Sequence, residues 1–352
     1  RCTVLLCTAT QPHFENYDIF PKGTQVTEII RDKEGLYAKL RRVKGEFIGK
    51  KNAGQIGAML REHTQALCIV NTKKHAREIY LQCKEQEGVF YLTTNLFHKH
   101  RDLVIKEIKE RLKLGLPCIV AATQVIEAGV DVDFPVVYRS MAGIDSLVQA
   151  AGRCNREGRF PAATLYVFEP EESNYSELKG YLGRTADISA RLIKKFNDAD
   201  FLGEQMANAY FKRLYKLEGD DGLDKKGILK EDRSRTRKYE FAFQKISEDF
   251  KLIEDSGIPV VIKNSTEDFQ KENSTVQKLL HDAQFAPKPG AVLRKIAPYC
   301  VNVREDTLKK LMDAGACELV ADTFYVLKDL SYYHEKMGLT VPDSYEGVDY
   351  IV

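Results

Sequence analysis

Short apolar runs alternate with segments of helical spacing through the middle of the chain. Runs of strand length lie at residues 66–71, 89–92, 118–122, 136–139 and 164–168. Between them, apolar side chains recur at helical intervals in residues 74–84, 98–114 and 145–152. Such alternation is typical of a parallel sheet with helices on both faces. The pattern therefore predicts an α/β domain with its functional loops at the carboxyl ends of the strands.

The later part of the chain has a different pattern. Residues 175–215 have amphipathic helical spacing, residues 219–238 are polar and basic, and short strands mix with helices after residue 239. The basic segment is either a solvated loop or a contact for nucleic-acid phosphates, and the pattern leaves both open. The expected organisation is a short leading segment, an α/β domain, a helical and basic linker, and a small α+β domain, at residues 1–20, 21–170, 171–238 and 239–352.

Charge and cysteine content narrow the class of protein. The 352 residues include 53 Lys and Arg against 51 Asp and Glu, a net charge of +2. A nucleic-acid surface must therefore be a local patch. No apolar run approaches the ~20 residues that span a bilayer. None of the 8 cysteines forms a Cys-x-x-Cys pair, which favours buried thiols in a reducing cytoplasm over disulfides or a zinc site.

The strongest chemical signal is the segment Gln149-Ala-Ala-Gly-Arg153-Cys-Asn-Arg156. If it is a helix, Gln149, Arg153 and Arg156 lie at i, i+4 and i+7 and share one face. Guanidinium groups match phosphate oxygens and can stabilise charge that builds on a transferring γ-phosphoryl group. Gly152 lets another backbone approach closely. The alternative, a solvated basic helix end, is disfavoured by the full Gln-x-x-Gly-Arg-x-x-Arg pattern.

A second segment follows the apolar run at 118–122 and contains Thr123, Gln124, Gly129 and Asp131. Thr123 and Gln124, at a strand end, can donate hydrogen bonds to a phosphate backbone. Gly129 allows a turn that presents Asp131, whose carboxylate can hold a ribose hydroxyl or orient a nearby arginine. The alternative is a helix N-cap at Thr123 followed by an ordinary turn at 129–133.

A third segment lies near the start of the chain. A strand-like run at 3–7 ends in Thr8-Ala-Thr10-Gln-Pro. Taken alone, small hydroxyl residues at this place indicate no more than a junction between a strand and a loop.

In chain order, the segments around Thr8, Thr123 and Arg153 resemble motifs III, V and VI of superfamily 2 helicases. Ile69-Val-Asn71-Thr72-Lys73, at the end of the run at 66–71, looks like motif IV, and Tyr91-Leu-Thr93-Thr94 with Arg101 resembles the short motif that follows. The detailed sequence of these segments is similar to the CRISPR-associated helicase–nuclease of type I systems. That similarity is specific over residues 118–159 and loose after residue 170, where 243–250 and 332–339 resemble the accessory C-terminal domain of the family.

The resemblance implies a RecA-like second motor domain, preceded at residues 1–20 by a remnant of the first. It implies that Arg153 and Arg156 contact the phosphates of ATP, with Arg156 the stronger candidate for an arginine finger. The nucleotide site would be supported by Gln149, Gly129 and Asp131. A DNA-tracking surface would consist of Asn71, Thr72, Thr94, Thr123 and Gln124, and coupling between the motor domains would involve Thr8 and Thr10.

The family unwinds and degrades foreign DNA. The resemblance implies ATP-driven 3′-to-5′ movement along a displaced single strand, which a metal-dependent His-Asp nuclease domain cuts. The implied cofactors are ATP with Mg²⁺, and a divalent nuclease metal held in a domain outside this chain. The implied partners are single-stranded DNA, the guide-RNA surveillance complex (Cascade) with its R-loop, the N-terminal half of the same protein, and a phage anti-CRISPR inhibitor.

Some motifs of the family are not in this sequence. It contains no Gly-x-x-x-x-Gly-Lys-Ser/Thr phosphate loop. The nearest segment, residues 45–51, has the wrong spacing and is expected to form a hairpin. His98 and His100 are expected to be a solvated pair at a helix start, and no metal site is predicted. We therefore expect the chain to begin inside a longer protein, and not to hydrolyse ATP or cut DNA alone.

Two other functions stay open at this point. The first alternative is an autonomous module that binds nucleic acid or protein without hydrolysis. The second is another superfamily 2 enzyme, such as an RNA helicase. A phosphate loop and a His-Asp motif encoded upstream would favour the helicase–nuclease.

Overall fold

The computed structural model describes residues 41–127, 129–171, 180–196, 200–224, 242–250, 257–263, 270–285 and 290–341, with a few isolated positions. Thr8, most of the leading segment and the basic residues 229–238 lie outside the described residues. The domain boundaries and the roles expected for those residues therefore stay predictions.

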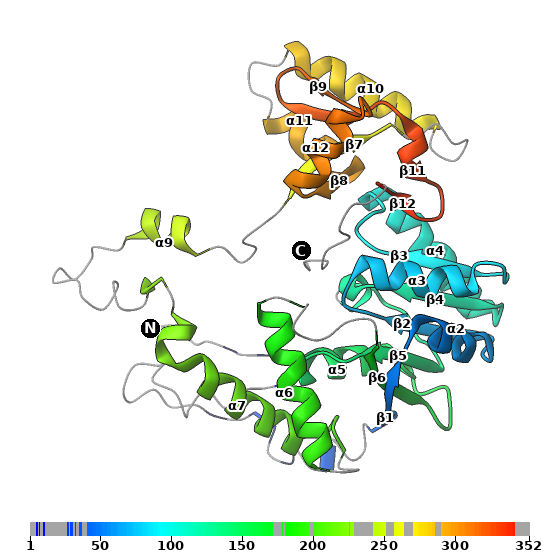
Figure 1. Cartoon of the computed structure of the whole chain (residues 1–352), viewed down its shortest axis with the longest axis vertical. Helices are drawn as coiled ribbons and strands as arrows, with labels where there is room; N and C mark the ends of the chain where they lie inside the picture. Colours follow the sequence, from blue (N-terminus) through cyan, green and yellow to red (C-terminus); the bar gives the residue numbers. More distant parts are fainter. Residues whose placement is uncertain are drawn as a thin grey trace.

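Six parallel strands form the sheet that the alternating pattern predicts, in the order β1-β6-β5-β2-β4-β3. The strands are β1 (Lys44–Lys51), β2 (Gln65–Ile69), β3 (Val89–Leu92), β4 (Cys118–Ala122), β5 (Val136–Ser140) and β6 (Thr164–Pro170). One face is covered by α2 (Ala53–Arg61) and α3 (Lys73–Cys83), the other by α4 (His98–Leu114), α5 (Ile144–Ala151), α6 (Tyr181–Lys195) and α7 (Glu204–Leu223) (Figure 1). The predicted fold with helices on both faces is confirmed.

Burial on two faces explains why the central strands are continuously apolar. Leu67, Val120 and Val137 pack toward α4 and α5, and Cys68 and Tyr138 pack toward α2 and α3. Parallel strands covered on both faces need apolar side chains at consecutive positions. Uninterrupted runs were therefore a reliable signal for these strands.

The hairpin expected at residues 45–51 is wrong. These residues form β1, an edge strand that pairs in parallel with β6 from Lys44 opposite Thr164 to Lys51 opposite Pro170. Gly49 has a φ of +72°, and the register shifts between Phe47 and Lys50. The glycine thus produces an irregularity in one strand, where we had expected a reversal of the chain. Charged edge positions hid the strand, because only one side of it pairs.

A second sheet follows in the C-terminal part, in the order β8-β7-β10-β9. Its strands are β7 (Ile258–Ile262), β8 (Cys300–Val303), β9 (Cys317–Val320) and β10 (Phe324–Leu327). The helix α12 (Glu305–Asp313) packs on one face, and α10 (Gln270–Phe285) and α11 (Gly290–Ile296) pack on the other (Figure 1). This is the predicted small α+β domain. None of the described helices is long and apolar enough to cross a membrane.

The C-terminal domain contacts the larger domain just after β3. The N–H of Leu339, in β12 (Gly338–Leu339), donates to the Asn95 carbonyl at 2.8 Å. Gly338 has a φ of +70°, and a Cβ there would lie 2.2 Å from the same carbonyl oxygen. A side chain at this position would therefore push the two backbones apart.

Tyr333, from β11 (Tyr333–His334), completes this contact. Its hydroxyl lies 2.8 Å from Nδ1 of His100 and accepts from the N–H of Phe97 at 3.4 Å. The prediction that His98 and His100 form a solvated pair is therefore wrong for His100, which is buried, whereas His98 is exposed. A residue 233 positions along the chain covers the ring of His100, and local sequence does not reveal such contacts.

The burial of His100 predicts a pH dependence of stability. Burial lowers the pKa of this ring from 6.5 to about 4, so the unfolded chain takes up a proton at a higher pH than the folded chain. Stability is therefore lost as the pH falls from about 6.5 to 4, by at most about 1.4 kcal/mol per pH unit from this group. We expect His100→Gln to reduce the slope of unfolding free energy against pH in urea titrations. His98→Gln is the control, and an unchanged slope in H100Q would refute the prediction.

Candidate nucleotide and nucleic-acid site

The carboxyl ends of three adjacent strands bring candidate residues together. They are Asn71 and Thr72 after β2, Thr94 after β3, and Thr123 and Gln124 after β4. The N–H of Val70 donates to the Ala122 carbonyl at 2.9 Å, and the N–H of Thr123 donates to the Leu92 carbonyl at 3.2 Å. The strand ends are thus held side by side, at the edge where ligands of α/β sheets bind.

The amides of Asn71 and Gln124 point toward each other inside the protein. Nε2 of Gln124 donates to Oδ1 of Asn71 at 3.3 Å, and Nδ2 of Asn71 donates to the Met141 carbonyl at 2.8 Å. Gln124 is 3% exposed and Asn71 is 4% exposed. Thr72 caps α3, since its hydroxyl accepts from the N–H of His75 at 3.2 Å. Contacts of these residues with DNA stay a prediction.

A buried arginine that the sequence analysis did not select lies beside these amides. Arg139, in β5, has 0% of its surface exposed. Its Nη1 donates to Oδ1 of Asn71 at 2.7 Å, and its Nε donates to Oε1 of Glu127 at 2.8 Å. Its Nη2 donates to the hydroxyl of Ser146 at 3.0 Å. The one available signal was an arginine inside an apolar strand, because such a charge needs acceptors around it.

Glu127 receives this arginine in an equally buried position. Burial raises the pKa of the Glu127 carboxyl, and the charge of Arg139 and the hydrogen bond from Ser146 oppose that rise. Glu127 follows η2 (Gln124–Ile126). This short helix lies in the second candidate segment of the sequence analysis, which contains Thr123, Gln124, Gly129 and Asp131. The carboxylate therefore ties this segment both to β5 and to the first turn of α5.

The helical face expected for Gln149, Arg153 and Arg156 is wrong. The helix α5 ends at Ala151, and Gly152 is its C-cap. Beyond it the chain continues in turns, and Asn155 has a φ of +46°. The N–H of Phe134 donates to the Arg153 carbonyl and the N–H of Asn155 donates to the Phe134 carbonyl, each at 2.9 Å. Gly152 keeps a right-handed backbone conformation, with φ of −66°, so the pairing with the Phe134 backbone is what directs the following residues along another path. Gln149 is exposed on the last turn of α5.

Arg153 is nonetheless held firmly. Its Nε donates to the carbonyl of Ile126 at 3.2 Å, and its Nη2 donates to the carbonyl of Glu127. Partial burial, and secondarily the positive charge of Arg156, lower the pKa of the Arg153 guanidinium. Arg153 therefore adds a positive group to this edge while bracing the segment that carries Glu127.

Arg156 is the more accessible of the two arginines. Its Nε lies 2.9 Å from Oδ1 of Asp131, with 46% of the arginine side chain and 71% of the aspartate side chain exposed. Asp131 follows Gly129, whose φ of +73° supports the turn expected there. Of the two roles considered for Asp131, the structure contains the contact with an arginine.

Asp133 shapes the loop that presents Arg156. Its two oxygens accept from the N–H groups of Arg156 at 2.6 Å and Glu157 at 3.3 Å, and Arg159 lies 3.3 Å away. Asp133 is buried. Two backbone donors and a guanidinium therefore converge on one carboxylate, which fixes the conformation of residues 156–159. The sequence analysis had not selected Asp133.

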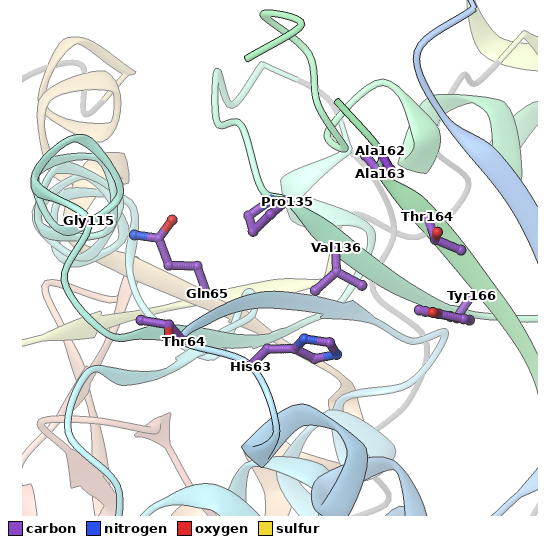
Figure 2. A pocket seen from close by; sticks show the side chains of 10 residues that line it. All are labelled: His63, Thr64, Gln65, Gly115, Pro135, Val136, Ala162, Ala163, Thr164 and Tyr166. Carbon is purple, nitrogen blue, oxygen red and sulfur yellow. The ribbon is translucent and has the colours of Figure 1, made fainter. Parts of the chain in front are cut away.

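The remaining features do not add a second site. A cavity of about 590 Å³ is lined by residues that precede or begin the strands, including His63, Gln65 and Thr164 (Figure 2). It lies at the amino edge of the sheet, opposite the candidate residues. Among the described residues, no group of three His, Cys, Asp or Glu side chains is arranged to hold a metal ion. Thr10 is partly exposed, and its coupling role stays a prediction.

A family model and curated relatives point to the same family over part of the chain. Residues 62–159 match the family model described as CRISPR-associated nuclease/helicase Cas3, C-terminal. The Cas3 protein of Methanothermobacter thermautotrophicus is 25% identical over 172 residues, which is 47% of this chain and 20% of that protein. The Cas3 protein of Haloferax volcanii is 56% identical over 64 residues, which is 17% of this chain and 7% of that protein.

Solved structures extend the likeness in fold. The crystal structure of T. fusca Cas3-AMPPNP matches with a TM-score of 0.52 and 14% identity, over 88% of this chain and 42% of that chain. The crystal structure of T. fusca Cas3-ATP matches with a TM-score of 0.50 and 13% identity, over 76% and 36% of the two chains. Identities this low support the fold alone. This chain therefore spans a minor part of each of these relatives.

Asp133 provides a test of the loop geometry. We expect Asp133→Ala to destabilise the folded chain by about 1–3 kcal/mol, because buried N–H groups lose their acceptor. Urea denaturation measures this change. Asp131→Ala, which removes an exposed carboxylate from the same segment, should change stability by less than about 1 kcal/mol. Equal effects of the two substitutions would argue against a bracing role for Asp133.

Proposed function

We propose that this chain, the C-terminal part of a CRISPR-associated nuclease/helicase of the Cas3 family, forms one side of that enzyme's ATP site. In this proposal Arg156 is the arginine finger, Arg153 and Gln149 lie beside the phosphates, and Gly129 and Asp131 form the supporting turn. The observation that carries the proposal is an exposed guanidinium, Arg156, on a loop braced from beneath by Asp133.

The pairing of Arg156 with Asp131 suits a finger. Both side chains are largely solvated, and such an ion pair contributes only about 0–1 kcal/mol. A triphosphate with Mg²⁺ offers several anionic oxygens, to which a guanidinium can donate two parallel hydrogen bonds. Arg156 can therefore exchange Asp131 for nucleotide at little cost, and there it would stabilise charge on the transferring γ-phosphoryl group.

The opposite side of the ATP site has to come from a second RecA-like domain. The sequence holds no phosphate loop, so the cradle for the phosphates and the Mg²⁺ ligands would be supplied by the N-terminal half of the same protein. Crystal structures of the T. fusca protein carry the names Cas3-ATP, Cas3-AMPPNP and Cas3-ADP, which supports nucleotide binding in the family. Hydrolysis would then need both halves, with Thr8 and Thr10 coupling them.

The carboxyl ends of the strands would carry single-stranded DNA. Thr72 and Thr94 are partly exposed there, and we assign them the direct contacts. Asn71, Thr123 and Gln124 are buried, so we assign them to the support of the same surface and to main-chain contacts. Movement would run 3′ to 5′ along a strand displaced by the guide-RNA surveillance complex (Cascade).

The rest of the family's activity lies outside this chain in our proposal. A nuclease domain with its own divalent metal would cut the DNA, in the cytoplasm, and a phage anti-CRISPR inhibitor would have this enzyme as its target. An autonomous binding module or an RNA helicase would instead show no DNA-dependent ATPase in the full-length protein.

The role of Arg156 can be tested in the full-length protein that contains this chain. We expect Arg156→Ala to lower the DNA-stimulated kcat for ATP by at least about a hundredfold, because the transition state loses a cation. Steady-state ATPase with saturating single-stranded DNA measures this loss. Arg191→Ala removes an exposed arginine on α6, outside the loop that presents Arg156, and should retain most activity. If R156A hydrolyses ATP at the wild-type rate, the assignment fails.

A further inference from the structure

We propose that Arg139 is a positioning residue that couples the DNA-facing strand ends to the arginines of the ATP site. The inference rests on the proposed function and adds to it a residue that touches neither ligand. It is carried by a continuous set of buried hydrogen bonds, defined here as the Arg139 network: Arg139, Glu127, Asn71, Gln124 and Ser146.

Arg139 joins three separate elements through one rigid group. Its guanidinium reaches Asn71 after β2, Glu127 after η2 and Ser146 in α5, at 2.7, 2.8 and 3.0 Å. Nη1 also reaches the carbonyl and hydroxyl of Ser140, at 3.0 and 3.2 Å. A guanidinium is planar and its donors have fixed directions. The three elements therefore cannot shift relative to one another without breaking a buried, charge-assisted hydrogen bond.

One end of the network is the predicted DNA surface. Oδ1 of Asn71 accepts from both Arg139 and Gln124. The two buried amides of that surface are therefore linked to Arg139 through one oxygen atom. Oε1 of Gln124 has no hydrogen-bond partner among the described residues. The amide of Gln124 is thus the least constrained member and the place where a rearrangement at the strand ends would enter.

The other end is the proposed ATP site. The Glu127 side chain binds Arg139, and the Glu127 main-chain carbonyl accepts from Arg153. A displacement of Glu127 is therefore transmitted to Arg153 through a single residue. Ser146, whose hydroxyl binds both Arg139 and Glu127, lies in the same helix as Gln149. Two independent links thus run from Arg139 to the residues that we place beside the phosphates.

A coupling element needs discrete arrangements, and buried ionic groups provide them. A charge without solvent access must keep its acceptors or exchange them for others, since partial loss is costly. DNA that reorients Asn71 or Gln124 would force such an exchange at Arg139. Glu127 and then Arg153 would follow. This ties nucleotide chemistry to occupancy of the strand ends.

The inference is tested in the full-length protein with two single variants and the double variant that combines them. Arg139→Met and Glu127→Leu each leave an unpaired buried partner, whereas the double variant replaces the pair with apolar side chains. Since such replacement is often neutral or stabilising, we expect the double variant to recover the Tm that each single variant loses. We expect its stimulation of ATPase by single-stranded DNA to stay at least about tenfold below wild type, with the ATPase measured without DNA largely retained.

Arg139→Lys keeps the charge and covers the case in which the double variant does not fold. A lysine can bind Glu127, but its ammonium is a point charge without the three-directional fork of arginine. We expect a folded protein that has lost most of its DNA stimulation. The matched control is Arg191→Met with Asp187→Leu, because this exposed pair at 2.9 Å lies on α6, away from the network. The control should behave as wild type.

The outcomes separate the two proposals. If the wild-type ATPase responds to DNA and the double variant or R139K responds equally, Arg139 has only a structural role and the inference is overturned. If the wild-type full-length protein has no DNA-stimulated ATPase, the proposed function fails, and this inference fails with it. Recovery of Tm without recovery of stimulation supports the inference.

Discussion

The buried guanidinium of Arg139 has no solvent to hydrogen-bond, so its acceptors must come from the protein. The arrangement of this domain at the carboxyl edge of the sheet follows from that constraint. Arg139 enters the core on β5, between two strands whose neighbouring side chains are apolar. Its acceptors come from the loops after β2 and β4 and from the start of α5. The loops that we associate with DNA and with ATP are thereby held by the same group. Apolar packing alone would stabilise the sheet but would not specify a single conformation for these loops.

The fold was largely predictable because its signals are local and repeated. Continuous apolar runs marked β2 to β6, since strands covered on both faces cannot alternate. The edge strand β1 was missed because Lys44, Lys50 and Lys51 are charged and one side of the strand is unpaired. The helix α10 faces its sheet with few apolar residues, among them Val276 and Leu280, so local spacing marks it only weakly. Edge and satellite elements need less burial and so leave weaker patterns.

The candidate site was predictable in position and less so in geometry. The motif residues do gather at one edge, because parallel strands end there together. The assumption of a helix through Arg156 failed because the helix ends at Ala151 and the residues after it pair with Phe134, which is distant in sequence. Arg139 contacts Glu127 and Asn71, which lie 12 and 68 residues away in the sequence. Asp133 contacts the backbone of Arg156, 23 residues away. A reading of local spacing cannot identify such partners.

In the proposed function, Asp131 orders the exposed side chain of Arg156 before a nucleotide binds. A long side chain that waits in solvent loses rotamer freedom when it binds, at about 0.5–1.5 kcal/mol for each side chain immobilised. The contact of Arg156 with Asp131 at 2.9 Å already restricts that freedom in the isolated chain. The carboxylate therefore acts as a substitute anion. In the proposed function, arrival of a phosphate would be an exchange of partners for an arginine side chain that is already ordered.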